Sequence, residues 1–195
     1  LALAAWGVRL HPAERLEAAL RLGADVPFFA AGHPAALVEG IGEHIVPLPA
    51  PEPAAGMVLI TPRERLSTAA VFAEFDRLPS AMSRAEERTT ELADLLRADI
   101  DGMTLAVTAP AMLEANDLWT PATRLSAGLE AARAAAARVL ERAVLLTGSG
   151  PTLVALYPSE AAATRAAVAL QAAAPAELEG AEIMTTSTMG RGEHR

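Results

Sequence analysis

Apolar residues near the start of the chain recur first at helical spacing and then in short runs. The leucines of "PAERLEAALRLG" are spaced for one face of a helix, with Pro12 near its predicted start and Gly23 just past its end. The following stretch, "AALVEGIGEHIVPLP", has two short apolar runs on either side of Gly40-Ile41-Gly42. Two such runs around a glycine-rich turn predict a β-hairpin.

The segment "PLPAPEPAAG" interrupts these patterns. It contains four prolines between Pro47 and Pro53, each of which lacks an amide donor and disfavours helix at the residue before it. The segment predicts a break in regular structure and a linker or domain edge. We therefore expect one domain over residues 1–53 and a second over residues 54–195.

Strand and helix patterns interleave beyond the prolines. "MVLIT" predicts a buried strand, and Ser67 is placed to cap the helix that follows it. A second, charged helix is predicted from about Ser83 to Arg97. The segment from Leu118 to Leu140 is predicted to be mostly one long helix, broken or capped near Pro121.

The last third of the chain continues this alternation. "AVLLTGSGPTLVALYP" predicts two strands around a glycine-rich turn, and "SEAAATRAAVALQAAA" predicts a capped, alanine-rich helix. The final predicted strand is "AEIMTTSTM". The interleaving favours an α+β sandwich with helices on one face of a sheet.

Composition and charge narrow the class of protein. Hydrophobic residues make up 52% of the 195 positions, yet no apolar run approaches the roughly 20 residues that cross a bilayer. The net charge is -8, and the 16 basic residues, all Arg, are scattered among acids, which argues against binding to nucleic acid. The absence of cysteine excludes a disulfide framework and fits a cytoplasmic protein. The sequence leaves the oligomeric state open.

The stretch "LGADVPFF" contains the first candidate for chemistry. Asp25 precedes Val26-Pro27, and proline is favoured in the first turn of a helix, so Asp25 is predicted at the N-cap of a short helix. One interpretation is that its carboxylate satisfies the free amides of that helix. The other is that the carboxylate, kept ionised by the positive field of the helix N-terminus, accepts a hydroxyl proton during phosphoryl transfer.

Gly148, Ser149 and Gly150 form the centre of "LTGSGPT", between two predicted strands. This stretch is either a tight connection or a loop in which glycine lets the backbone approach a ligand and turn consecutive amides toward an anion. It has neither the glycine spacing nor the lysine of a Walker loop.

Several other residues have a structural interpretation beside a functional one. His33 and His44 flank the predicted hairpin without the i, i+4 spacing of helical metal ligands, so we predict no protein-held transition metal. Phe72 is either a core residue or a stacking surface for a flat base. Asn116 and Asp117, in "EANDLWTPA", are interpreted as helix caps.

Three segments of the chain, in their order along it, resemble the sequences of one protein family. "RLGADVPFFAAGHPAALVEGIGE", "STAAVFAEFD" and "LTGSGPT" resemble the central and C-terminal parts of the galacto-, homoserine, mevalonate and phosphomevalonate (GHMP) kinases, and favour a member with a cytidyl substrate. The resemblance implies a two-domain α+β architecture. Residues 1–53 would be the C-terminal part of the nucleotide-binding domain, and residues 54–195 a ferredoxin-like α+β sandwich on the substrate side.

The resemblance also implies an activity and its residues. It implies an ATP-dependent small-molecule kinase of non-mevalonate isoprenoid synthesis, with Mg²⁺ accompanying ATP and a cytidine-diphosphate-linked sugar alcohol as substrate. By position, Asp25 matches the base that takes the proton from a tertiary hydroxyl. The implied phosphate loop is Gly148, Ser149 and Gly150, and the implied substrate pocket contains Thr68, Phe72 and His33.

Two alternatives stay open. Another GHMP kinase, of the homoserine or mevalonate type, would share the Gly-Ser-Gly loop. A non-catalytic α+β ligand-binding module is the other, because the family's catalytic lysine and N-terminal phosphate loop do not appear in the sequence. We therefore expect this chain to be the C-terminal share of a longer enzyme, inactive without the rest.

Overall fold

The computed structural model describes residues 7, 10–78, 85–98 and 100–188. These residues group into two compact units, which adjoin in the sequence between Pro49 and Ala50. The assignment of residues 1–53 and 54–195 to two kinase domains concerns their function and stays a prediction.

The first unit contains two helices and a hairpin. Helix α2 (Pro12–Leu22) begins and ends where the leucine spacing predicted, and a short α3 (Val26–Ala31) follows it. Strands β1 (Ala35–Glu39) and β2 (His44–Leu48) pair antiparallel, which confirms the predicted hairpin. Pro47 lies inside β2, where it pairs with Ala36, so regular structure stops later than the proline pattern predicted.

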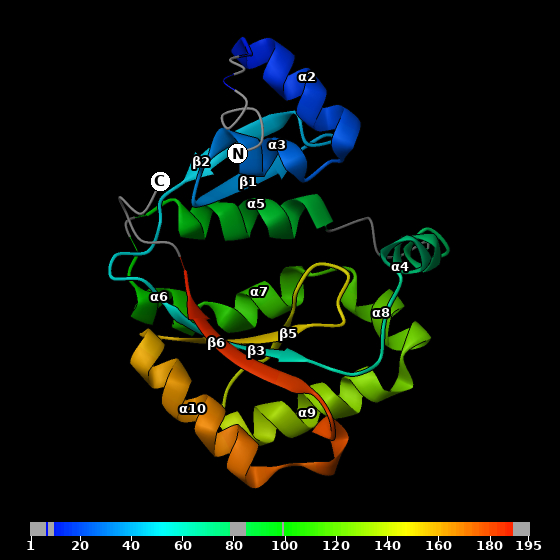
Figure 1. Ribbon diagram of the computed structural model, residues 1–195, viewed down its shortest axis with the longest axis vertical. Helices are drawn as coiled ribbons and strands as arrows, with labels where there is room; N and C mark the ends of the chain where they lie inside the picture. The colour runs from blue at the N-terminus through cyan, green and yellow to red at the C-terminus, as the bar shows by residue number, and fades with distance from the viewer. Residues whose placement is uncertain (1–6, 8–9, 79–84, 99, 189–195) are drawn as a thin grey trace. The chain divides into compact units, whose positions relative to one another are not determined.

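A four-stranded antiparallel sheet forms the centre of the second unit (Figure 1). Its strands are β3 (Gly56–Thr61), β4 (Leu145–Leu146), β5 (Leu153–Tyr157) and β6 (Glu182–Ser187), in the spatial order β4-β5-β3-β6. Helix α10 (Glu160–Ala173) connects β5 to β6, which lie on either side of β3. This order and connection are those of a ferredoxin-like β-α-β-β-α-β fold, as the resemblance implied.

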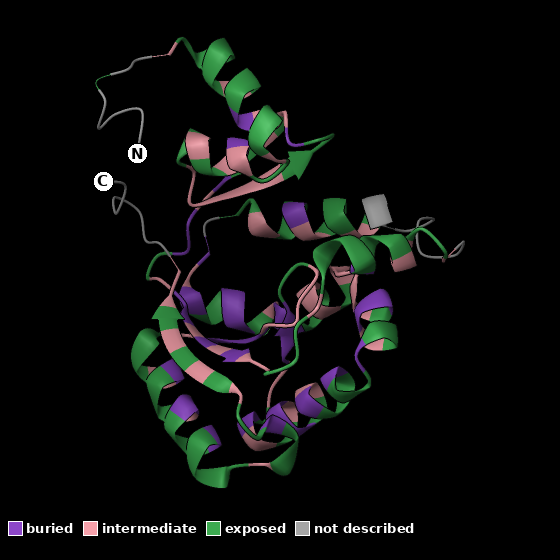
Figure 2. Ribbon diagram, turned by 45° about the vertical axis from the view of Figure 1, so that its right-hand side comes forward, coloured by how far each residue is buried: buried purple, intermediate pink, exposed green. Residues whose placement is uncertain are grey.

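Helices cover both faces of this sheet, whereas the sequence pattern predicted helices on one face only. Helix α10 and helix α9 (Ala127–Leu140) pack on the face that presents Leu153, and Figure 2 shows their buried residues turned toward the sheet. Helices α6 (Gly102–Val107) and α7 (Ala109–Ala115) pack on the opposite face, which presents Leu156. Strand β5 is consequently buried along its whole length.

The sequence predicted a break or a cap near Pro121: a helix does begin two residues before this proline, but the break lies at Ser126. Helix α8 (Trp119–Leu125) ends there, Ser126 is extended with φ −134°, and α9 begins at the next residue. Pro121 lies in the first turn of α8, where a missing amide removes no intrahelical hydrogen bond. Ser126 is buried, and its hydroxyl donates to the carboxylate of Glu64.

The remaining helices include two that the sequence pattern missed. Helix α4 (Thr68–Phe75) begins with Ser67 as its cap, as predicted, and helix α5 (Ala85–Leu96) lies within the predicted charged helix. Residues 83 and 84 of that prediction lie outside the described residues. The short helices α6 and α7 were not predicted, and none of the described helices is long and apolar enough to cross a bilayer.

Helix α4 is joined to helix α8 by an ion pair. Arg124 donates to Glu74 at 3.2 Å, and Arg77 donates to the other oxygen of the same carboxylate at 3.2 Å. These hydrogen bonds, that from Arg124 first, lower the pKa of Glu74 from its ordinary value of 4.5.

Replacing a side chain that fills the larger core tests this packing. Leu153, the first residue of β5, is fully buried beneath helices α9 and α10. Leu153→Ala should therefore lower the free energy of unfolding by about 2–5 kcal/mol, because burial is lost and a cavity is left. Urea denaturation measures the change. Val168→Ala, at a position 60% exposed on α10, is the control and should stay within about 0.5 kcal/mol of the parent chain.

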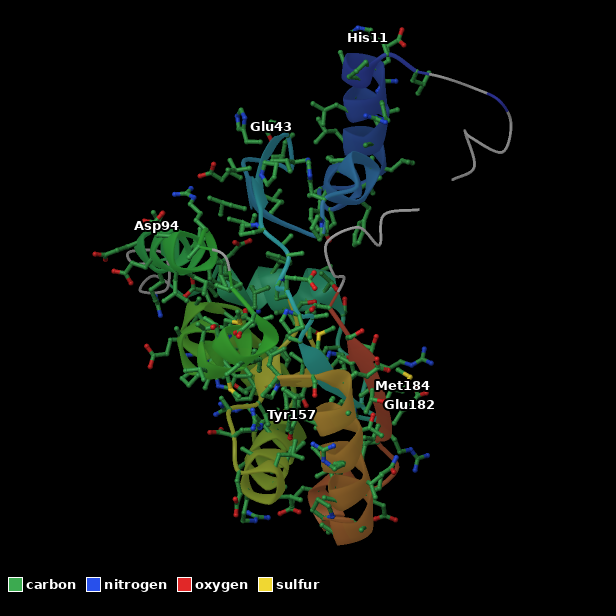
Figure 3. All side chains as sticks on the ribbon, turned by 90° about the vertical axis from the view of Figure 1, so that its left-hand side faces the viewer. His11, Glu43, Asp94, Tyr157, Glu182 and Met184 are labelled. Carbon is green, nitrogen blue, oxygen red and sulfur yellow. The ribbon has the colours of Figure 1, made fainter. Side chains whose placement is uncertain are left out.

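The Glu74 ion pair should make stability depend on pH. Because the pKa of Glu74 is lower in the folded chain, its contribution is complete above the ordinary value of 4.5 and is lost as the pH falls through the lowered value. Glu74→Gln should therefore reduce the urea midpoint at neutral pH, and the difference from the parent should vanish in acid. Glu182→Gln, on exposed β6 (Figure 3), is the control. A difference that grows as the pH falls would contradict the assignment.

Candidate functional site

Asp25 occupies the N-cap position of helix α3 without using its side chain as a cap. Its backbone is helical, with φ −84° and ψ −18°, and its carboxylate accepts no capping hydrogen bond. Pro27 lies in the first turn of α3, as predicted, and is buried. The residue is exposed. The structural interpretation, in which this carboxylate satisfies the free amides of the helix, is therefore wrong.

The β1–β2 turn contacts the segment that contains Asp25. Gly42 has φ +102°, and a Cβ at this position would overlap the carbonyl oxygen of Ala24. Only glycine therefore allows this approach of the turn to the residue beside Asp25. His33 lies at the other end of α3, after Gly32, and is half-buried.

The "LTGSGPT" stretch forms a tight turn between β4 and β5. The amide of Gly150 donates to the carbonyl of Thr147 at 2.8 Å, and the amide of Thr147 donates to the carbonyl of Thr152 at 3.0 Å. Gly148 has φ +52° and Gly150 has φ +79°, which favour glycine at both positions. A Cβ on Gly150 would also lie 2.6 Å from Cδ1 of Leu146.

Asn116, between α7 and α8, binds this turn through its side-chain amide. Its Nδ2 donates to the carbonyl of Leu146 at 3.0 Å and to the carbonyl of Gly148 at 3.1 Å. Its Oδ1 accepts from the amide of Leu118 at 3.0 Å. We call the two donated bonds the Asn116 bridge. One side chain thus joins the start of α8 to the turn.

Thr68 contacts the same turn from helix α4. The hydroxyls of Thr68 and Ser149 lie 3.0 Å apart, within hydrogen-bonding distance. Phe72 follows Thr68 by one helical turn, so the two side chains share a face of α4. Phe72 is 49% exposed, which contradicts its interpretation as a core residue.

The structure therefore collects the predicted site residues in two groups. Asp25 and His33 lie at the two ends of α3 in the first unit. The second unit brings Thr68 of α4 into direct contact with Ser149 of the turn, although 81 residues separate them in the sequence. Within the residues that the structure describes, no cluster of three His, Cys, Asp or Glu side chains is arranged to bind a metal ion.

A cleft of about 670 Å³ lies beside the Asn116 segment, but none of the predicted site residues lines it. Three arginines line it, and each contacts another side chain. Arg88 pairs with Asp117 at 3.2 Å, Arg124 pairs with Glu74, and the guanidinium of Arg133 lies 4.1 Å from the ring centroid of Trp119. Carboxylates thus pair with two of the three arginines, whereas Nε of Arg133 is buried without a hydrogen-bond partner among the described residues, and we assign the cleft no reactive group.

The sequence pattern missed the part that Asn116 plays in the turn. It drew attention to "EANDLWTPA" but interpreted Asn116 and Asp117 as helix caps. The Oδ1 of Asn116 does bond an amide two residues ahead, and its Nδ2 also bonds carbonyls 30 and 32 residues away. One signal in the sequence is that Asn116 is the only asparagine of the 195 residues.

Comparisons with known proteins place the chain in a family. The family model described as "GHMP kinases C terminal" matches residues 78–176, slightly more than half of the chain. A solved structure of 4-(cytidine 5'-diphospho)-2C-methyl-D-erythritol kinase superposes with a TM-score of 0.61 and 28% identity. The match covers 96% of this chain and 61% of that one.

Two curated relatives are similar over most of the chain. The 4-diphosphocytidyl-2-C-methyl-D-erythritol kinase of Symbiobacterium thermophilum is 35% identical over 82% of this chain and 53% of its own length. The protein of the same name from Sinorhizobium medicae is 35% identical over 89% of this chain and 52% of its own length. The chain thus spans about half the length of these relatives. The family match and the shared fold confirm the resemblance, and the chain belongs to the GHMP kinase family through its C-terminal domain.

Proposed function

We propose that the protein containing this chain transfers the γ-phosphoryl group of ATP to the tertiary 2-hydroxyl of 4-diphosphocytidyl-2-C-methyl-D-erythritol (CDP-methylerythritol). The relatives of that name support the substrate. The structural observation that carries the proposal is the contact between Thr68 and Ser149. It joins the segment proposed for substrate binding to the loop proposed for phosphate binding.

Asp25 is the proposed general base. As the hydroxyl oxygen of the substrate forms its bond to the γ-phosphorus, the bond from that phosphorus to the bridging oxygen of ADP breaks, and the hydroxyl proton passes to the carboxylate. A base must be ionised and free to accept a hydrogen bond from the hydroxyl. The exposure of Asp25 and the absence of a side-chain capping bond support this role.

The Gly-Ser-Gly turn is proposed to bind phosphate oxygens of ATP or substrate. Among the described residues, the amides of Gly148 and Ser149 have no hydrogen-bond acceptor. Amides of this kind, on a turn that glycine allows to come close to a ligand, bind anions through their donors. Mg²⁺ bound to the ATP phosphates would offset their charge and needs few protein ligands.

Helix α4 and His33 are proposed to bind the rest of the substrate. Phe72 presents an exposed ring on the same face of α4 as Thr68, which suits stacking on a cytosine base. Thr68 would supply a polar contact, and His33 a further one. In this proposal residues 1–53 belong to the nucleotide-binding domain, residues 54–195 form the substrate-side domain, and the enzyme acts in the cytoplasm.

Removing the proposed base is the first test. In the natural protein that contains this chain, Asp25→Asn should lower kcat by about 100-fold or more, because general bases contribute at least that factor. The melting temperature should change little, since the Asp25 side chain makes no capping bond. Asp94→Asn, an exposed carboxylate on α5 that pairs with Arg97, is the control and should keep its activity. Turnover of Asp25→Asn within about tenfold of the parent would rule out the base role.

A substrate comparison tests the proposed specificity. CDP-methylerythritol, homoserine and mevalonate should be offered separately with MgATP, and ADP release should be measured by a coupled assay. We expect turnover with CDP-methylerythritol and a reduced affinity for it in Phe72→Ala, since stacking on an aromatic ring is worth about 1–3 kcal/mol per base. Preference for homoserine or mevalonate would instead identify another GHMP kinase, and turnover of none would favour a non-catalytic module.

A further inference from the structure

The Asn116 bridge fixes the direction of one peptide group in the Gly-Ser-Gly turn. The peptide bond between Gly148 and Ser149 is trans, so its C=O and N–H groups point in opposite directions. The carbonyl of Gly148 accepts from Nδ2 of Asn116 at 3.1 Å. The N–H of Ser149 must therefore point away from Asn116.

The same reasoning applies to the Leu146–Thr147 peptide, two peptides earlier, and shows that the bridge is consistent with the sheet. The carbonyl of Leu146 accepts from the same Nδ2 at 3.0 Å, and the N–H of Thr147 points the other way to the carbonyl of Thr152, at 3.0 Å. In that peptide the outward N–H has a partner within the protein. In the Gly148–Ser149 peptide it has none among the described residues.

The turn and Asn116 favour the same orientation of this peptide. Gly148 has positive φ and Ser149 does not, so within the turn closed by the Gly150 amide the Cβ of Ser149 already favours the observed direction of the peptide between them, because the reversed peptide needs positive φ at both residues. Thr68 contacts the hydroxyl of Ser149 and therefore limits the side chain of that residue. Nδ2 of Asn116 is the contact that bonds the carbonyl of the peptide itself.

We propose that Asn116 is a positioning residue which directs the Ser149 N–H outward as a donor to a phosphate oxygen. The inference rests on the proposed kinase function, and it adds a residue outside the Gly-Ser-Gly turn to the phosphate-binding apparatus. Asn116 itself touches neither the reacting atoms nor the phosphate in this account. It acts only through the Gly148 carbonyl.

Asn116→Asp is the sharpest test, because it replaces the donor Nδ2 with an oxygen and keeps the acceptor for Leu118. Two carbonyls would then face a carboxylate oxygen, which should turn the Gly148 carbonyl away from position 116 and move the Ser149 N–H with it. Nuclear Overhauser effects between Gly148 and Ser149 in the 195-residue chain report this orientation without any ligand. Gln171→Glu, an exposed amide on α10, adds the same charge away from the turn and should leave the orientation unchanged.

Kinetics of the natural protein that contains the chain supply the second readout. In Asn116→Asp the KM for ATP or for CDP-methylerythritol should rise by about tenfold or more, with a smaller change in kcat. The reason is the loss of the charge-assisted hydrogen bond from the Ser149 N–H to a phosphate oxygen. A lower urea midpoint with unchanged peptide orientation would show that Asn116 is only a structural anchor and would overturn the proposal. Should Asn116→Asp fail to fold, Asn116→Ser removes the same donor without adding charge.

The two hypotheses fail in different ways. If the parent protein phosphorylates no substrate, the proposed kinase function is wrong, whereas the peptide orientation in Asn116→Asp still reports on the bridge. If the parent is an active kinase and Asn116→Asp keeps both its peptide orientation and its KM values, the positioning role is wrong and the kinase function stands.

Discussion

The amide of one side chain, Asn116, bonded to two carbonyls of a glycine-rich turn, is the interaction on which the candidate site depends. Glycine at positions 148 and 150 allows the turn its positive φ angles, and glycine is also the residue that resists a change of backbone direction least. The two bonds from Nδ2 hold the carbonyls of Leu146 and Gly148 toward Asn116. Donors that are oriented before the ligand arrives bind an anion without the cost of reorganising the loop.

The fold explains why Asn116 reaches the turn. Strands β4 and β5 carry the turn at the end of the sheet, and helix α7 packs on the sheet face that presents Leu145 and Val154. Asn116 immediately follows α7, so the packing of that helix delivers the side chain to the turn. On the other side of the turn, Thr68 approaches from the first residue of α4. Helix α7 therefore serves the site as well as the core.

Local patterns in the sequence predicted much of this fold, and long-range contacts account for the rest. Leucine spacing and end residues placed α2, and two short apolar runs around a glycine-rich turn placed the β1–β2 hairpin. Helices α6 and α7 are too short for a clear period, and without them the second covered face of the sheet could not be foreseen. Pro121 suggested a break, but its position in the first turn of α8 makes it compatible with helix. The Asn116 bridge spans 30 residues, so neighbouring positions gave no sign of it.

A crystal structure of the natural protein that contains this chain, bound to a non-hydrolysable ATP analogue and CDP-methylerythritol, tests the central claim most directly. The account predicts that the Ser149 N–H donates to a phosphate oxygen at about 2.7–3.2 Å while the Gly148 carbonyl still accepts from Asn116. A nucleotide and substrate bound without contact to the turn, or a Gly148–Ser149 peptide pointing the other way, would contradict it.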